Sequence, residues 1–259
     1  MPEYKVTILK SGQADVPGPE VFWMSHWFEW ETLYFHMVLI QGEGITAIIN
    51  TGPPADLTQL NELFRNFAGD RCQMLRQENE RPLAALRTAG VEPQDIQYIL
   101  LTPLVSYANA NVSLFPAVKK IFISRRGWIE EFFAPEFPGF VPRNILMPDD
   151  VVTYLTTKVF DRVHLVGEEE EVLPGIRMFW VGVHHRSSMA ISIPTNKGRV
   201  VISDCFFKYK NIEDNIILGV TESVEECKRS YARIRREADI AVPLYDPAVL
   251  DRFPGGVIG

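Results

Sequence analysis

Residues 100–111 read LLTPLVSYANAN, an apolar strand followed by a turn of small and polar residues. The run IQYILLT at 96–102 is short and almost continuously apolar, which predicts a buried strand. The turn after it contains no His, Asp, Glu or Cys, the residue types that bind most metals in proteins. The sequence therefore predicts a loop at the end of a strand that has no side chain suited to hold a metal.

Strands and helices alternate on both sides of this loop, in two comparable blocks. Patterns of apolar and turn residues predict a strand at 4–12, a hairpin at 35–52, and helices at 56–67 and 80–90. In the second block the predicted strands are 119–126, 175–183, 188–195, 198–204 and 239–247, and the predicted helices are 127–133 and 223–238. The acidic run EEEE is predicted to be a solvated turn at 168–171. This order predicts an α/β fold, an αββα sandwich of two packed mixed sheets flanked by helices, in a single domain over residues 1–259.

The composition excludes several classes of protein. The 259 residues carry a net charge of −7 with a sequence pI of about 5.3, and no run of Lys and Arg suggests a nucleic-acid partner. No stretch of about 18 apolar residues predicts a membrane span, and the N-terminal stretch lacks the apolar core of a signal peptide. The three cysteines have no metal-type spacing and favour a reducing compartment. We therefore expect a cytoplasmic protein that binds a small molecule.

Five segments carry a resemblance to a known family. They are INTG at 49–52, the stretch 99–116 around the opening loop, and the stretches 180–191, 200–207 and 241–256. In order and spacing they resemble the signature regions of the metallo-β-lactamase superfamily, in particular its lactonase-like hydrolases. In that family a dinuclear zinc-type site polarises a carbonyl group and generates hydroxide from bound water. The resemblance implies the αββα sandwich and a hydrolase-like activity.

The ligand motif of that family is mostly absent. Its loop reads Thr-His-x-His-x-Asp-His, and Thr102 matches the Thr. The four ligand positions are occupied here by Pro103, Val105, Tyr107 and Ala108. Pro, Val and Ala have no side-chain atom that can bind a metal.

Only two of the later ligand positions are retained. His184 and Asp204 match a ligand His and the bridging Asp, whereas Tyr245 stands at the final His and Asn50 at a supporting Asp. The resemblance therefore implies no standard dinuclear site and no metal cofactor. An alternative keeps one weakly held divalent metal on His184 and Asp204.

The candidate catalytic residues are His184, Asp204, Tyr107 and Tyr245. His184 is predicted to be a general base, although bracing the loop is an equal alternative. Asp204 needs a partner, which could be His184, Lys208 or Arg186. The two tyrosines could donate hydrogen bonds to a carbonyl oxygen or fill the space of the missing metals.

The segment 22–36 holds many aromatic residues and predicts a wall over the site or a contact between copies in a homodimer. The candidate substrate-binding residues are Ser106, Asn109, His185, Arg186, Lys208, Trp27 and His26. Together these features favour a metal-independent enzyme acting on a small ester, lactone, thioester or amide, or one that transfers protons. The alternative is a non-catalytic relative that binds a small ligand or a partner subunit.

Overall fold

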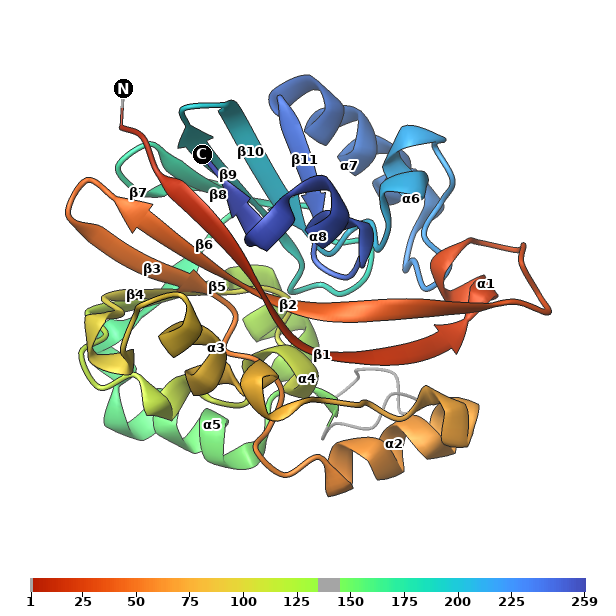
Figure 1. The fold of residues 1–259 in the computed structure, drawn as a ribbon, viewed down its shortest axis with the longest axis horizontal. Helices are drawn as coiled ribbons and strands as arrows, with labels where there is room; N and C mark the ends of the chain where they lie inside the picture. The colour runs from red at the N-terminus through yellow and green to blue at the C-terminus, as the bar shows by residue number, and fades with distance from the viewer. Residues whose placement is uncertain (1, 135–144) are drawn as a thin grey trace.

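Two β-sheets pack face to face between outer helices (Figure 1). The computed structural model describes residues 2–134 and 145–259. One sheet has seven strands in the order β12-β1-β2-β3-β4-β5-β6, and the other has five in the order β11-β10-β9-β8-β7. Both sheets mix parallel and antiparallel pairs. This arrangement confirms the predicted sandwich.

The seven-stranded sheet contains the predicted strand before the opening loop. Its strands are β1 (Lys5–Pro17), β2 (Trp30–Gly42), β3 (Ile45–Ile49), β4 (Tyr98–Leu101), β5 (Lys120–Ser124), β6 (Val163–Val166) and β12 (Val257–Ile258). The predicted hairpin is confirmed by β2 and β3, which turn at Glu43 and Gly44 with φ angles of 52° and 72°. The first strand is longer than predicted, because a bulge between Lys10 and Gly12 lets its pairing with β2 continue.

The five-stranded sheet contains one strand that the sequence pattern missed. Its strands are β7 (Glu169–Leu173), β8 (Ile176–Trp180), β9 (Met189–Thr195), β10 (Gly198–Ser203) and β11 (Ile240–Pro243). The prediction of a solvated turn at 168–171 was wrong, because most of this run lies in β7. Strand β7 is an edge strand, and the Glu169 carboxylate forms ion pairs with Arg177 and Arg233. Arginine partners thus allow a strongly acidic segment to pair at the edge of the sheet.

Helices cover the outer faces of the sheets (Figure 1). The predicted helices correspond to α2 (Thr58–Ala68), α3 (Pro82–Thr88) and α7 (Val224–Glu237), and the one predicted at 127–133 is a π-helix, Gly127–Phe132. The shorter helices are α1 (Gly18–Val21), α4 (Ser106–Asn109), α5 (Asp149–Thr153), α6 (Tyr209–Glu213) and α8 (Ala248–Arg252).

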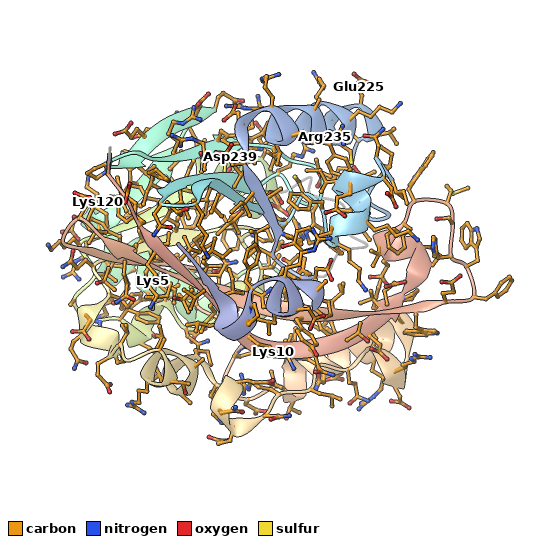
Figure 2. The ribbon with its side chains drawn as sticks, turned by 45° about the horizontal axis from the view of Figure 1, so that its top comes forward. Lys5, Lys10, Lys120, Glu225, Arg235 and Asp239 are labelled. Carbon is orange, nitrogen blue, oxygen red and sulfur yellow. The ribbon has the colours of Figure 1, made fainter. Side chains whose placement is uncertain are left out.

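Helix α7 illustrates how the sequence selects the buried face. Ser223 caps its N-terminus by accepting a hydrogen bond from Glu226 N at 3.3 Å, and Tyr231 and Ile234 are fully buried. Glu225, at the start of the helix, is exposed and projects outward (Figure 2). In the part of the chain that the structure describes, no helix has the length and apolarity needed to cross a bilayer.

Candidate functional site

The loop that follows β4, residues 102–111, is fastened to both sheets through its backbone. The Asn50 side chain accepts a hydrogen bond from Thr102 N at 2.9 Å and donates one to Thr102 O at 2.7 Å. The Thr102 hydroxyl accepts from Met189 N at 2.8 Å and donates to Met189 O at 3.2 Å. Because Asn50 follows β3 and Met189 begins β9, Thr102 joins the two sheets with neutral hydrogen bonds.

Two asparagines of this loop also bond to the protein itself. The buried Asn109 amide donates a hydrogen bond to Pro103 O. The Asn111 amide donates to the carbonyl oxygens of residues 51–53 at 2.9, 3.0 and 2.8 Å. The donor groups of these side chains are therefore used to hold the loop in place.

His184 and Asp204 form a buried pair at the ends of the second sheet. His184 Nδ1 lies 3.1 Å from Asp204 Oδ2, and Ser188 Oγ donates to the same oxygen at 2.5 Å. The His184 side chain is 9% exposed and that of Asp204 is fully buried. Burial lowers the pKa of His184 to about 4, helped by the adjacent His185, although Asp204 acts in the opposite direction. His184 is therefore neutral at pH 7.

Aromatic rings pack around this pair. The rings of Tyr107 and Tyr245 lie 6.4 Å apart between centroids, and Phe35 lies 5.4 and 5.6 Å from them. Phe207 lies 4.8 Å from the Tyr245 ring and 4.7 Å from the His184 ring. Burial raises the pKa of both phenols well above the usual value, and the charge of Asp204 adds to the effect. Both tyrosines are therefore protonated hydrogen-bond donors at neutral pH.

A second buried ion pair fixes the segment that carries His184. Glu131, on the π-helix, contacts His185 Nδ1 through one carboxylate oxygen and accepts from Ser187 N at 2.9 Å through the other. Burial alone would lower the pKa of His185, but the Glu131 carboxylate outweighs burial and raises it. The π-helix can approach Ser187 closely because residue 127 is a glycine. A Cβ at that position would lie 2.2 Å from the Ser187 Cβ. The loop 182–188 is thus held from both sides.

Comparison with solved structures identifies the architecture. The chain resembles an N-acyl homoserine lactone hydrolase with N-hexanoyl-L-homoserine bound at its catalytic metal centre, at 20% identity and a TM-score of 0.75, over 98% of this chain and 99% of that one. The chain has the metallo-β-lactamase fold. A quorum-quenching N-acyl homoserine lactone lactonase matches over 100% and 99% of the two chains at 18% identity, with a TM-score of 0.74.

A probable metal-dependent hydrolase from Staphylococcus aureus shares the metallo-β-lactamase fold at 19% identity, over 90% of this chain and 84% of that one, with a TM-score of 0.67. No protein-family model and no curated protein sequence matches the chain. At these identities the likeness extends to the fold, so the chemistry must be argued from this chain's own residues.

The described residues do not fit the metal centre that usually accompanies the metallo-β-lactamase fold. Residues 2–134 and 145–259 contain no group of three or more His, Cys, Asp and Glu side chains that could hold a metal ion. In the loop after β4, Val105 and Ala108 are buried, with no ligand atom in their side chains. A catalytic zinc takes three protein ligands, and His184 and Asp204 supply two.

Three of the predicted substrate-binding residues have carboxylate partners within the protein, and one of them is His185, paired with Glu131. Arg186 contacts Glu222 and forms a 2.6 Å ion pair with Glu226. Lys208 pairs with Glu31. The Asp204 carboxylate accordingly has His184 as its ionisable partner, one of the three that the sequence left open.

The remaining predicted binding residues lie apart from the His184–Asp204 pair or are already bonded. The Ser106 hydroxyl donates to Ile145 O at 2.9 Å. His26 Nδ1 lies 2.9 Å from the Ser25 hydroxyl, and Trp27 is 60% exposed on the same connection between α1 and β2. Binding roles for these residues stay predictions.

Sequence reasoning missed Glu131, Ser188 and Phe207, whereas Phe35, which packs against Tyr107 and Tyr245, belongs to the aromatic segment 22–36. Glu131 is one of two adjacent glutamates in GWIEEFF, and no local signal separates the buried one from its neighbour. Ser188 follows the conspicuous pair of histidines by three residues, but its contact with Asp204 depends on the turn between them.

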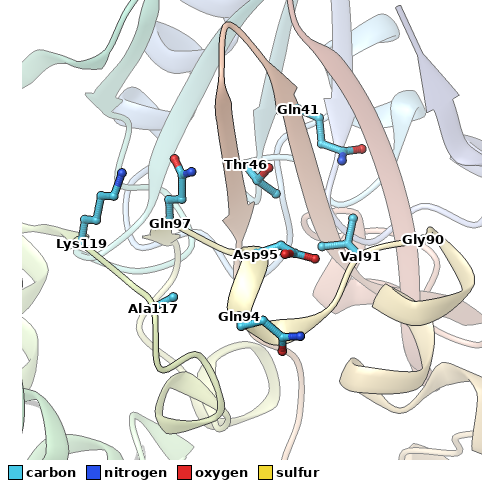
Figure 3. A pocket seen from close by; sticks show the side chains of 9 residues that line it. All are labelled: Gln41, Thr46, Gly90, Val91, Gln94, Asp95, Gln97, Ala117 and Lys119. Carbon is cyan, nitrogen blue, oxygen red and sulfur yellow. The ribbon is translucent and has the colours of Figure 1, made fainter.

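Two surface cavities lie outside the aromatic cluster. One, of about 350 Å³, borders Ser106, Leu60 and Asp149 beside the loop after β4. The other, of about 450 Å³, is lined by polar side chains including Gln97 and Lys119 (Figure 3). Since these two residues precede β4 and β5, the larger cavity lies at the opposite end of the strands from His184 and Asp204.

Proposed function

We propose that this chain is a metal-independent acid–base enzyme with hydrolase-like chemistry, in which His184 and Asp204 form the catalytic pair. The observation that carries the proposal is the 3.1 Å contact between His184 Nδ1 and Asp204 Oδ2, supported by Ser188. A carboxylate bonded to Nδ1 fixes the imidazole so that Nε2 is the nitrogen that exchanges a proton. The pair thus has the arrangement that a general base requires.

The proposed reaction is attack of water on the carbonyl carbon of a small ester, lactone, thioester or amide. His184 would remove the proton of the attacking water, and Tyr107 or Tyr245 would donate a hydrogen bond to the carbonyl oxygen as it becomes negative. The protonated His184 would then give its proton to the leaving oxygen, sulfur or nitrogen as the bond between that atom and the carbonyl carbon breaks. The raised pKa of both phenols supports the donor role, because it keeps them protonated. Lactones are included among the proposed substrates because the solved structures similar to this chain include N-acyl homoserine lactone hydrolases. An isomerisation by proton transfer would use the same groups.

We infer that zinc has no part in this chemistry, since too few ligand side chains gather around His184 and Asp204. The test is metal analysis of protein purified without an affinity tag, incubated with zinc or iron and then desalted. We expect far less than one ion per chain. Two tightly bound ions per chain would refute the inference.

The catalytic proposal is tested by rates on a panel of acyl esters, thioesters and lactones, including N-hexanoyl homoserine lactone. His184→Ala should lower the rate on an active substrate by about 10²–10⁴-fold, the usual contribution of a general base. His164→Ala is the matched control, because His164 also contacts a carboxylate, Glu170, but lies away from the site. Equal rates for wild type and His184→Ala would remove the catalytic role. His184→Gln, which keeps an amide near Asp204, checks that any loss is not caused by misfolding.

A second candidate is a non-catalytic binding protein. The observation that favours it is the loop after β4, whose asparagine donors and Thr102 hydroxyl all bond to the chain itself. Under this hypothesis the panel shows no turnover above buffer, and a small ligand or a partner chain raises the unfolding temperature. Turnover that disappears in His184→Ala would exclude it.

A further inference from the structure

One oxygen of the buried Asp204 carboxylate lacks a partner. Oδ2 receives both the Ser188 hydroxyl and His184 Nδ1, whereas Oδ1 is fully buried and makes no hydrogen bond. Leaving a charged oxygen buried and unpaired costs more than leaving a neutral group unpaired, so such an atom indicates a missing donor.

The cations nearest in sequence do not supply that donor. Among the residues that the structure describes, His184 is the one basic side chain within ion-pair distance of Asp204. Lys208 and Arg186, the other candidate partners, are bonded to carboxylates elsewhere. His185 interacts electrostatically with Asp204, but it is already paired with Glu131.

The surroundings of Asp204 are rich in aromatic rings. Phe207 and Tyr245 pack edge to face 4.8 Å apart beside His184, and the buried Tyr245 hydroxyl interacts with the Tyr107 hydroxyl. Tyr107, the third ring, also interacts with Asp204 electrostatically. Aromatic faces attract cations with little need for fixed geometry, and they offer nothing to an anion.

We propose that this site binds the ammonium group of a small organic amine, with Asp204 Oδ1 as the acceptor and the rings of Phe207, Tyr107 and Tyr245 as its walls. The inference builds on the proposed function, because it names the class of molecule that the same metal-free site would take. An ammonium group can pair with one carboxylate and lie against aromatic faces, whereas a zinc ion needs three or more ligands that the described residues do not gather. A substrate for the proposed enzyme would then be an ester or amide that carries an amine.

The test is calorimetric titration and thermal unfolding of the full chain with n-propylammonium chloride. The neutral isostere n-propanol and sodium chloride at equal ionic strength are the ligand controls. We expect saturable binding of the amine alone, with the unfolding temperature raised by about 3 °C at ten times the Kd. A response of equal size to sodium chloride or n-propanol would overturn the proposal.

Variants locate the site. Asp204→Asn removes the charge and should abolish amine binding, and Phe207→Leu should weaken it about fivefold through loss of one aromatic face. Phe207→Leu also serves if Asp204→Asn does not fold. Asp149→Asn is the matched control, because Asp149 is an acidic residue that lines the separate cavity near Ser106. Unchanged binding in Phe207→Leu, or binding lost in Asp149→Asn, would contradict the proposed location.

These measurements do not depend on turnover, so the two proposals fail separately. If the chain binds the amine but His184→Ala and wild type have equal hydrolysis rates, the ammonium site is supported and the catalytic proposal is refuted. If the chain hydrolyses neutral esters but does not bind the amine, the catalytic proposal is supported and the ammonium site is refuted.

Discussion

The two loops that meet at the site are held by different kinds of bond. The loop 102–111 is fastened by amides, hydroxyls and backbone groups, with Asn50 and Asn111 as its main anchors. The loop 182–188 is fastened by the Glu131–His185 ion pair and by the approach of Ser188 to Asp204. Where ligand side chains are lacking, the bonds are neutral, and the buried atom of that loop without a partner is the neutral amide oxygen of Asn109. Where His184 and Asp204 remain, the bonds are charged and one carboxylate oxygen stays unpaired.

The difference indicates that neutral hydrogen bonds can hold a loop beside the site in a defined shape without any ionisable side chain. Neutral hydrogen bonds hold the first loop in position with little dependence on solution conditions, whereas charged groups keep the second loop responsive to pH and to ligands. Four substitutions probe this comparison, from the largest expected effect to the smallest.

Glu131→Ala should have the largest effect. It leaves His185 and the Ser187 N–H without their partner, and breaking a buried pair typically costs about 3–5 kcal/mol. The free energy of unfolding from urea titrations measures the loss. Glu130→Ala, a change at the exposed neighbour, should cost less than about 0.5 kcal/mol. Similar losses in both variants would mean that the second loop does not depend on the ion pair.

Asn111→Ala tests the neutral loop. Three carbonyl oxygens at residues 51–53 would lose their donor, and we expect a cost of about 2–3 kcal/mol. Asn66→Ala, on the exposed face of α2, is the control and should be close to neutral. The loss should be the same at pH 6 and pH 9, since no charged group takes part; a strong dependence on pH would break the comparison.

Ser187→Ala tests the link between the loops. Ser187 Oγ accepts the hydrogen bond of Leu104 N at 3.0 Å, so the substitution leaves a buried N–H unpaired at a cost of about 1–2 kcal/mol. A double-mutant cycle with Asn111→Ala measures whether the two loops are coupled. Additive losses would mean that each loop is held independently.

The smallest effect concerns pH dependence. The pKa of Glu131 is lowered in the fold, so its contribution is present above its ordinary value and is lost as pH falls through the folded value. The pKa of His185 is raised, so its contribution is fully present below 6.5 and is lost as pH rises through the folded value. Stability of the wild type should therefore decline above neutral pH more than that of Glu131→Gln. Wild-type unfolding curves that coincide at pH 7, 8 and 9 would contradict a charged Glu131–His185 pair.

Much of this arrangement could be predicted from the sequence. The resemblance to the signature regions of the metallo-β-lactamase superfamily predicts that Tyr107, His184, Asp204 and Tyr245 share one site, and the ring contacts bring them together. The partner of Asp204 could not be chosen in advance, because Lys208 and Arg186 have carboxylate partners that come from distant segments.

Features that depend on tertiary docking escaped prediction. Glu131 is buried because the π-helix rests on Ser187, a contact that only the folded chain defines. The sequence pattern predicts a turn in place of β7, because the ion pairs of Glu169 with Arg177 and Arg233 form only in the folded chain. Local sequence patterns predict helices and strands well. They do not identify the partner of a charged residue when that partner lies far along the chain.

The paired hydrogen bonds between Thr102 and Met189 have a consequence for how the two halves of the molecule are joined. At this point the two sheets are connected by groups of the polypeptide itself. If the chain is metal-independent, as we propose, treatment with a chelator should leave this connection intact and the unfolding temperature unchanged.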